Sequence, residues 1–407
     1  GVAQGTVPTP NIDSIAQSGI NFTNGYAGQG TCAPSRAMMM TGRYGSRFGF
    51  EFTPTPAGMP TAIGLMSAAS DKPPTILNED AKTIPYDEMG LPASEVTIAE
   101  ELKANGYYTA HIGKWHLGRS NGMLPHEQGF DDSLLMASAL YLPEDDPNTV
   151  NAKIPFDPID KFLWKALTYA NSFNSGDDDR FKPKGYLTDY WTDESINVIK
   201  ANKNRPFFLY LAHWGPHTPL QATREDYDAV GDIQPHRKRV YAAMIRAIDR
   251  SVGRVLDTLD QEGLADNTII FFFSDHGGML SRSKRFIFNN GTQVPLIIRV
   301  PEKWRHLAEF DYGKYLPGSV NDELVQFVDF PKTILSMVGI SPSPKMHGRV
   351  FMGPKYEAEP PFVYFYRDRQ NGRYDMSRAV TDGRYYLIRN FMPHRPRGQK
   401  PEHGYTV

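Results

Sequence analysis

Residues 207–217 read FFLYLAHWGPH, an apolar run that leads directly into a polar segment. A short apolar run rich in aromatic residues predicts a buried β-strand. A second run of this kind, residues 268–273, leads into Asp275 and His276. Between the two runs, apolar residues recur every three or four positions and predict a long amphipathic helix that ends near Gly263. This helix would bury Val240, Met244, Ile248, Val252, Val255 and Leu259. The order strand, helix, strand predicts a parallel crossover.

A third apolar run, residues 107–112, precedes Lys114 and His116. It follows a predicted helix whose start is marked by Thr97 and Glu100, the spacing of a capping box. In open parallel sheets the ligand crevice lies outside the carboxyl ends of the strands. We therefore expect the polar segments after these three strands to meet at one site.

The whole chain alternates short apolar runs with amphipathic helices, which is typical of an α/β fold with a largely parallel central sheet flanked by helices. Because 407 residues exceed the usual size of a single core, we expect two units. Residues 1–305 would form the catalytic α/β domain and residues 306–407 a smaller C-terminal antiparallel α+β subdomain. In the second unit, residues 324–338 predict a helix and residues 380–388 a hairpin that turns at Gly383.

The composition excludes several classes of protein. With 40% hydrophobic residues, 22% charged residues and a net charge of −2, the chain is typical of a globular protein and unlike one that binds nucleic acid. No apolar stretch reaches 18 residues, so we expect no membrane span. The chain begins with Gly1 and shows no signal-like segment, so we expect that a leader was removed or that the sequence begins late.

The single cysteine, Cys32, lies in the segment CAPSR, residues 32–36. A lone cysteine has no partner for a disulfide within its own chain. Pro34 fixes its own φ and disfavours a helical conformation in the residue before it, while Arg36 places a permanent cation near the sulfur. We expect a helix to follow from Ala37, so that the thiol lies near a helix N-terminus. An anionic group is favoured at such a place.

This segment, together with Thr41-Gly42-Arg43, resembles the signature of the type I sulfatases of the alkaline phosphatase superfamily. The resemblance extends from residues 9–13 to residues 392–396. It implies that a formylglycine-generating or equivalent maturation enzyme converts Cys32 to formylglycine. The hydrated aldehyde would attack the sulfur of a sulfate ester, and its second hydroxyl would later expel sulfate. A thiol cannot take the second step, so unmodified Cys32 is expected to be nearly inactive.

The resemblance implies a catalytic set formed by Cys32, Arg36, Lys114, His116, His217 and Lys284. In this set Arg36 stabilises the hydrated aldehyde, and Lys114 and Lys284 contact the sulfate. His116 orients the diol, and His217 protonates the leaving oxygen. The alternatives are an ordinary surface salt bridge for Arg36, an ordinary strand-end lysine for Lys114, a core-facing histidine for His116 and a solvated basic turn for Lys284.

Asp275 is a candidate metal ligand, because a carboxylate after an apolar strand is costly unless it meets a cation. The resemblance implies a site formed by Asp275, His276 and Cys32, with Ca²⁺ as the expected ion. Sulfatases commonly have Asp-Asn where this chain has Asp275-His276, and a histidine nitrogen suits transition metals, so another divalent ion stays open. Family members also carry an Asp-Asp pair at the end of the first strand. This chain starts too late to contain that pair, and Asp13, which lies on the helix that follows, is not a substitute. We therefore expect the first strand to be missing from this sequence.

The C-terminal segment resembles that of a bacterial branch of the family that includes glycan sulfatases. The resemblance implies contacts with a sulfated sugar from Arg367, Arg369, Arg373 and His394. A charged hairpin surface is the alternative. The resemblance thus implies a sulfuric ester hydrolase that removes sulfate from a sulfated polysaccharide or oligosaccharide, in the periplasm or outside the cell. Asp275-His276 favours instead a phosphonate monoester or phosphodiester hydrolase. The missing aspartate pair favours a non-catalytic glycan-binding relative.

Overall fold

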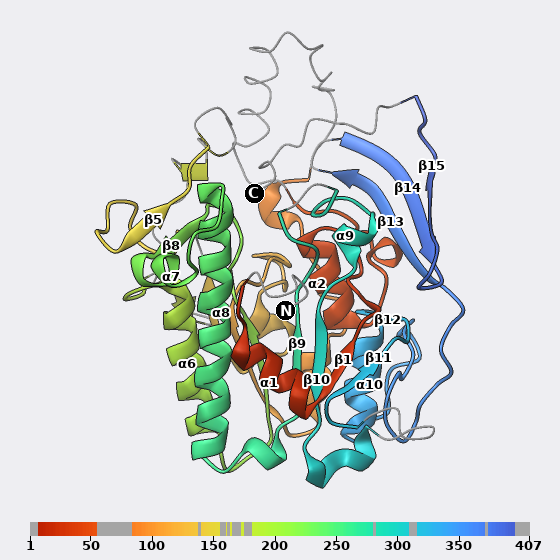
Figure 1. Ribbon diagram of the computed structural model, residues 1–407. Helices are drawn as coiled ribbons and strands as arrows, with labels where there is room; N and C mark the ends of the chain where they lie inside the picture. Colours follow the sequence, from red (N-terminus) through yellow and green to blue (C-terminus); the bar gives the residue numbers. More distant parts are fainter. Residues whose placement is uncertain are drawn as a thin grey trace.

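The computed structural model describes residues 7–54, 84–136, 140–154, 160, 163–164, 172–174, 181–279, 282–308, 316–370 and 373–394. Two four-stranded sheets lie at the centre, with helices on both sides and a three-stranded sheet at the periphery (Figure 1). The expected α/β class, with a parallel sheet flanked by helices and a small antiparallel sheet, is confirmed. In the described part of the chain, no helix is both long and apolar enough to cross a membrane.

The first sheet contains two of the three strands predicted from the apolar runs. Its order is β6 (Ser172–Asn174), β4 (Asp132–Met136), β3 (Tyr108–Gly113) and β7 (Phe207–Ala212). Strand β3 pairs in parallel with both β4 and β7, whereas β6 is antiparallel to β4. The helix before β3, α4 (Ile98–Ala104), begins with the predicted capping box of Thr97 and Glu100. Because β3 and β7 are parallel, their carboxyl ends lie at the same edge of the sheet.

The second sheet contains the third predicted strand. Its order is β11 (Ser319–Asn321), β1 (Ile20–Phe22), β10 (Leu296–Arg299) and β9 (Ile270–Phe273). Strand β1 is parallel to β11 and antiparallel to β10, which is antiparallel to β9. The predicted crossover is therefore corrected, because β7 and β9 belong to different sheets. Both still pack on one apolar cluster, with Phe207 of β7 and Ile270 of β9 against Leu259.

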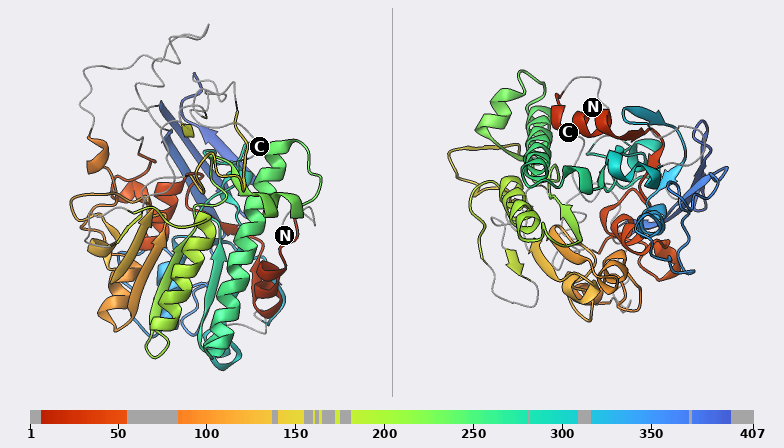
Figure 2. Two further views of the ribbon diagram at one scale, coloured as in Figure 1. Left: turned by 90° about the vertical axis from the view of Figure 1, so that its left-hand side faces the viewer. Right: turned by 90° about the horizontal axis from the view of Figure 1, so that it is seen from below.

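The long predicted helix is α8 (His236–Gln261), and it ends shortly before Gly263, which has φ of +69°. Its apolar face buries Val240, Met244 and Ala247. Helix α8 packs beside α6 (Leu187–Ala201), and both lie along one flank of the strands (Figures 1 and 2).

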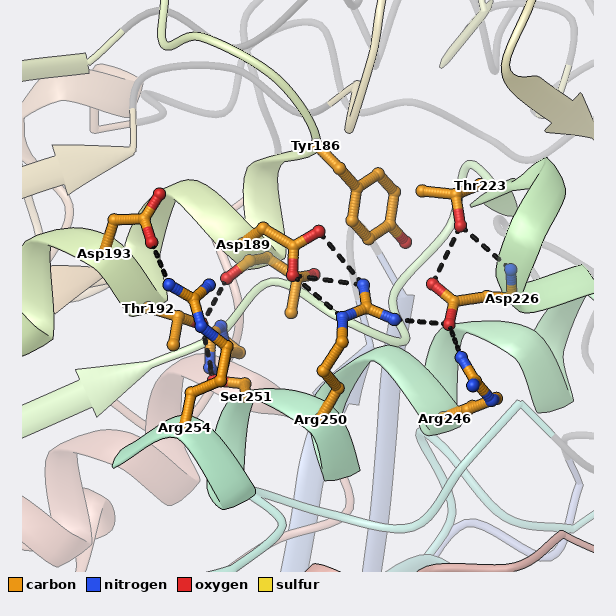
Figure 3. Close-up of polar contacts among 12 residues, drawn as sticks. Tyr186, Asp189, Thr192, Asp193, Thr223, Asp226, Arg246, Arg250, Ser251 and Arg254 are labelled. Carbon is orange, nitrogen blue, oxygen red and sulfur yellow. Dashed lines mark hydrogen bonds and ion pairs between the residues drawn. The ribbon is translucent and has the colours of Figure 1, made fainter. Parts of the chain in front are cut away.

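Ion pairs join α8 to α6 and to the short helix α7 (Arg224–Ala229) (Figure 3). Asp226 is fully buried and receives hydrogen bonds from both Arg246 and Arg250. Arg250 also pairs with Asp189 of α6 at 3.0 Å. This network fixes three helices relative to one another. It also holds the strand before α7, β8 (Gln221–Thr223), which pairs with β5 (Thr149–Asn151).

Two predicted helices begin at different residues in the structure. Helix α2 spans Cys32–Thr41 and so includes Pro34 in its first turn, where the expectation was a turn followed by a helix from Ala37. Proline is tolerated there because the first N–H groups of a helix lack intrahelical partners. Helix α10 spans Asp329–Met337, and the residues expected to begin it form β12 (Val325–Gln326), which pairs with β2 (Gly25–Tyr26).

The remaining helices are short. Helix α1 (Pro10–Ser18) packs against α8, and α9 (Asn289–Thr292) precedes β10. The largest apolar cluster of the described residues includes residues of α2, α4 and α10, among them Ala37, Leu102 and Phe330.

The C-terminal sheet is antiparallel, with order β13 (Val363–Gln370), β14 (Arg373–Thr381) and β15 (Tyr386–Asn390). Strands β14 and β15 form the predicted hairpin, and Gly383 has φ of +86° in its turn. One face of the sheet packs Phe365 and Ala379 against Tyr26 and Leu324. Seen from below, this sheet lies at the edge of the molecule, well apart from α6 (Figure 2). The proposed division of the chain at residue 305 stays a prediction.

Candidate active site

The polar segments after β3, β7 and β9 meet at the N-terminus of α2, as the sequence predicted. Lys114 follows β3 directly, His217 lies in the loop after β7, and Asp275 follows β9 by two residues. Hydrogen bonds, ion pairs and charge interactions connect these residues to Cys32 or Arg36.

Arg36 connects α2 to all three strand ends. Its Nε donates to Oδ2 of Asp275 at 2.8 Å, and its Nη1 donates to the carbonyl oxygen of Lys114 at 2.6 Å. Nη1 also donates to the hydroxyl of Tyr210 on β7 at 2.9 Å. The Arg36 side chain is only 7% exposed. It therefore makes a buried ion pair, and the surface salt bridge considered above is wrong.

Asp275 is ionised in this setting. Burial raises the pKa of its carboxyl, but His276, Arg36 and Lys114 outweigh that effect and hold the pKa well below its usual value. Ser35 donates from Oγ to the backbone carbonyl of Asp275 at 2.6 Å, which fixes the backbone at this point. The first turn of α2 thus sets both the position and the charge of the carboxylate.

Cys32 is the first residue of α2 and is buried. Burial raises the pKa of its thiol, but the positive charges of Lys114 and Lys284 hold the pKa well below its usual value. His116 also faces the sulfur, and burial lowers the pKa of this imidazole despite its hydrogen bond with Cys32. The surroundings of the sulfur therefore favour a negative charge.

Cys32, Asp275 and His276 form a group that can hold a metal ion, with one ligand atom of each within 4.8 Å of the others. His276 Nδ1 lies 2.7 Å from the carbonyl oxygen of Gly277, which can only accept, so Nδ1 carries the proton. His276 Nε2 lies 3.0 Å from Cys32 Sγ and 3.5 Å from Asp275 Oδ1. A backbone carbonyl that fixes the tautomer in this way is common behind metal-binding histidines. A thiolate, an imidazole and a carboxylate fit a divalent ion.

Lys284 and His217 form a second pair beside the sulfur. Nδ1 of His217 lies 2.6 Å from the carbonyl oxygen of Thr218 and must donate to it, so Nε2 accepts from Nζ of Lys284 at 2.7 Å. Burial lowers the pKa of His217 to about 3 and that of Lys284 to about 8. His217 is therefore neutral, and the pair holds its proton on the lysine. The interpretation of Lys284 as part of a solvated basic turn is wrong.

Gly30 allows the segment that contains Lys284 to approach Cys32. The backbone N–H of Arg285 donates to the carbonyl oxygen of Gly30 at 2.6 Å. A Cβ atom on Gly30 would lie 2.4 Å from the carbonyl oxygen of Phe286, which is too close for any other residue. Lys284 is thus brought to the site by a contact between two backbones.

The four predicted sugar-binding residues are only partly described. Arg367 is buried, with its guanidinium 5.0 Å from the ring centre of Phe286. His394 is exposed after the end of β15. Arg369 and Arg373 lie at the ends of β13 and β14, and their side chains are outside what the structure describes.

Two site residues were missed by the sequence analysis. Tyr210 carries the one hydroxyl in the apolar run of β7, and a buried hydroxyl needs a hydrogen-bond partner, which here is Arg36. Trp214 lies beneath Lys114, whose Nζ is 4.9 Å from the ring centre, and its ring also lies 3.9 Å from that of His217. His213, in the same loop, lies with Nε2 2.8 Å from the hydroxyl of Ser251 on α8.

The curated proteins that are similar to this chain include sulfatases. The chain is 31% identical to the uncharacterized sulfatase YdeN of Escherichia coli (strain K12), over 82% of this chain and 54% of that protein. It is 28% identical to an ulvan-active sulfatase of Formosa agariphila, over 99% of this chain and 59% of that protein. The chain thus spans little more than half the length of these two relatives.

Solved structures share the fold. A crystal structure of Ps i-CgsB is 26% identical, with a TM-score of 0.69, and the match covers 97% of this chain and 83% of that one. Ps i-CgsB has also been solved in complex with k-i-k-neocarrahexaose. The family model described as Sulfatase matches residues 1–340. With a match over most of its length, the chain belongs to the sulfatase family.

Proposed function

We propose that this chain is a sulfuric ester hydrolase that removes sulfate from a sulfated carbohydrate, with a formylglycine made from Cys32 as the nucleophile. The main support is the position of Cys32, buried at the start of α2 among Arg36, Lys114 and Lys284. A sulfate ester carries negative charge on its oxygens, so its hydrolysis needs cations fixed around the reacting sulfur. This cluster supplies them in a site sheltered from water.

Each cation is held by contacts that do not depend on substrate. Asp275 and the carbonyl of Lys114 hold the guanidinium of Arg36, and Trp214 supports the ammonium of Lys114. When present, formylglycine supplies a geminal diol, of which one hydroxyl attacks and the other permits release of sulfate. The residues around position 32 orient that group and stabilise the charge on the sulfate.

We propose that Lys284 and His217 together provide the proton for the leaving alcohol. The ammonium of Lys284 holds the proton and donates a hydrogen bond to Nε2 of His217. The leaving alcohol can therefore receive the proton from Nζ of Lys284 or from Nε2 of His217. This differs in detail from a histidine that acts alone as the acid. Nδ1 of His217 is fixed by Thr218, so only Nε2 exchanges the proton.

Asp275 and His276, together with the group at position 32, would hold a divalent cation that neutralises charge on the sulfate oxygens. Calcium takes about six to eight oxygen ligands, whereas the described residues offer one carboxylate and one imidazole. The donors described here thus suit a transition metal such as zinc better than calcium. We propose a divalent metal site, with calcium as the ion that the family resemblance implies.

The proposed substrate is a sulfated polysaccharide or oligosaccharide. The relative from Formosa agariphila is named for activity on ulvan, and Ps i-CgsB was solved with k-i-k-neocarrahexaose. Arg367, Arg369, Arg373 and His394 are the proposed sugar-contacting residues. Of these, Arg367 stacks on Phe286, two residues from Lys284. Maturation by a formylglycine-generating enzyme and a periplasmic or secreted location complete the proposal.

The test is to co-express the full chain with a formylglycine-generating enzyme and to measure two quantities on the same sample. Mass spectrometry of the Cys32 peptide gives the converted fraction, and ion chromatography gives sulfate released from a panel of sulfated oligosaccharides with Ca²⁺, Mn²⁺ or Zn²⁺. Release should scale with the converted fraction, and Cys32→Ala should release none. Converted, metal-loaded protein that releases no sulfate from any sugar would contradict the proposal.

His276 gives a reason to test a second reaction of the superfamily. Phosphonate monoester hydrolysis can be measured beside aryl sulfate hydrolysis, with phenyl phosphonate esters and 4-nitrophenyl sulfate at equal concentration. We expect the sulfate to react faster. A faster phosphonate reaction would reassign the enzyme, and binding of sulfated sugar without turnover of either would favour a glycan-binding relative.

A further inference from the structure

The C-terminal sheet has a second, exposed face that the proposed function does not use. On β15, side chains alternate between the core and solvent, and Tyr386 and Ile388 point inward to Phe365. The other parity is exposed: Tyr385 is 67% exposed and Leu387 is 66% exposed. A β-strand places alternate residues on opposite faces, so these residues share one face with Arg389 and Phe391.

The same face continues across the other two strands. Leu387 pairs with Val380 of β14, and Val380 pairs with Tyr364 of β13, which is 58% exposed. We call this surface the outer face, formed by Tyr364, Val380, Tyr385, Leu387, Arg389 and Phe391. Exposed apolar and aromatic side chains that lie together on one face commonly mark a binding site.

The outer face is positively charged. The guanidinium of Arg389 lies 4.8 Å from the ring centre of Phe391, and that of Arg384 lies 5.2 Å from the ring centre of Tyr385. Residues 376–391 contain three arginines and one carboxylate, Asp382, which accepts hydrogen bonds from backbone N–H groups of the hairpin turn. Because Arg378 pairs with Asp368 of β13 at 2.7 Å, the charge offered to a ligand comes from Arg384 and Arg389. Aromatic rings flanked by guanidinium groups suit a ligand with flat apolar faces and anionic substituents.

We propose that the outer face binds a sulfated polysaccharide, as a second site for the polymer from which the active site removes sulfate. The inference rests on the proposed function for its choice of ligand. Sugar rings would stack on Tyr385 and Tyr364, and sulfate groups would pair with Arg384 and Arg389. Arg367, which stacks on Phe286, lies three residues after Tyr364, roughly 10 Å along β13 and on its opposite face, so the outer face is a separate surface from the active site.

The charge of the face also decides between ligands. A symmetric contact between two copies of the chain would bring the same arginines of both copies together, and like charges in one interface are unfavourable. A sulfated polymer instead neutralises them.

The experiment compares two double variants with a matched control. Arg384→Gln/Arg389→Gln removes the charges, and Tyr364→Ser/Leu387→Ser removes the apolar surface. Arg205→Gln is the control, because Arg205 is an exposed arginine that stacks on Tyr108 at 4.1 Å, outside the outer face. Binding is measured by affinity electrophoresis in gels that contain dextran sulfate or neutral dextran, with thermal melting to confirm that each variant is folded.

We expect each double variant to weaken retardation by dextran sulfate at least fivefold, with no retardation of any protein by dextran. Arg205→Gln should behave as the wild type. On a sulfated polymer the double variants should raise KM and leave kcat on 4-nitrophenyl sulfate unchanged. Unchanged binding in the double variants, or equal loss in Arg205→Gln, would overturn the proposal. So would a concentration-dependent dimer, seen by sedimentation, that either double variant abolishes.

Failure of this proposal is separable from failure of the proposed function. Binding is measured on the Cys32→Ala variant as well, which needs no maturation and no turnover. If that variant binds dextran sulfate while converted protein releases no sulfate, the outer face stands and the enzyme assignment falls. If sulfate is released while binding is unaffected by the double variants, the enzyme assignment stands and the outer face falls.

Discussion

At the scale of single residues, the site depends on how Arg36 is held. Its guanidinium has three acceptors: a carboxylate, a backbone carbonyl and the phenol of Tyr210. A guanidinium has a fixed planar set of donors, so each acceptor also fixes its orientation. In the proposed reaction, Tyr210 is therefore a positioning residue that acts through Arg36.

Tyr210→Phe should lower kcat of the matured enzyme by about tenfold, with KM nearly unchanged, because a misplaced charge costs about 1.4 kcal/mol in the transition state. Tyr186→Phe is the matched control, since the Tyr186 hydroxyl is buried and donates to the backbone carbonyl of Gln221 at 3.0 Å, away from Arg36. Both variants should lose about 1 kcal/mol of folding stability. Steady-state kinetics and urea unfolding check this. Equal kcat in the two variants would show that Tyr210 has only a structural role.

At the scale of secondary-structure elements, the helices beside the site are held by charges of very different burial. The carboxylate of Asp226 is fully buried between two arginines, whereas the pair of Arg254 with Asp193 is exposed (Figure 3). Removing a buried partner leaves charges without compensation, while exposed pairs are weakened by solvent. The same ion-pair chemistry therefore has different consequences at the two places.

Asp226→Ala should reduce the free energy of unfolding by about 3 kcal/mol, because Arg246 and Arg250 lose their shared partner. Asp193→Ala should reduce it by about 0–1 kcal/mol. Chemical denaturation of both variants beside the wild type measures the difference. Similar losses in the two variants would mean that the buried carboxylate contributes no more than the exposed one.

At the scale of the whole molecule, buried neutral histidines make the fold sensitive to acid. Burial lowers the pKa of His111 to about 3 and that of His213 to about 4. In the unfolded chain each would titrate near its usual value of about 6.5. Below that pH the unfolded chain binds protons that the folded chain does not bind, so stability is lost as pH falls from about 6.5 toward 4.

As the pH falls through that window, protonation of each of these histidines in the unfolded chain should reduce the free energy of unfolding by about 1.4 kcal/mol per pH unit. His213→Gln keeps an amide near Ser251 and should flatten the pH dependence by about that amount. Urea unfolding between pH 7 and pH 5 provides the measurement. Parallel curves for His213→Gln and the wild type would refute the assignment.

The sequence predicted the strands and helices because their signals are local. The apolar runs became β3, β7 and β9, the capping box opened α4, and the hairpin turned at Gly383. Burial of an apolar run, a cap and a left-handed turn each depend on a few neighbouring residues. The errors came where local signals compete: Pro34 lies inside the first turn of α2, and the segment before α10 pairs as β12.

The sequence by itself therefore determined the class of the fold and the convergence of Lys114 and His217, because the parallel strands β3 and β7 bring their carboxyl ends to one edge. Asp275 also reaches the site, although β9 lies in the other sheet. Only the tertiary structure decided that β7 and β9 lie in different sheets, since strand pairing depends on partners distant in the chain. Only the tertiary structure placed Tyr210 on Arg36 and gave the proton of the Lys284–His217 pair to the lysine. Such contacts join residues far apart in sequence, and no local pattern records their distance or orientation.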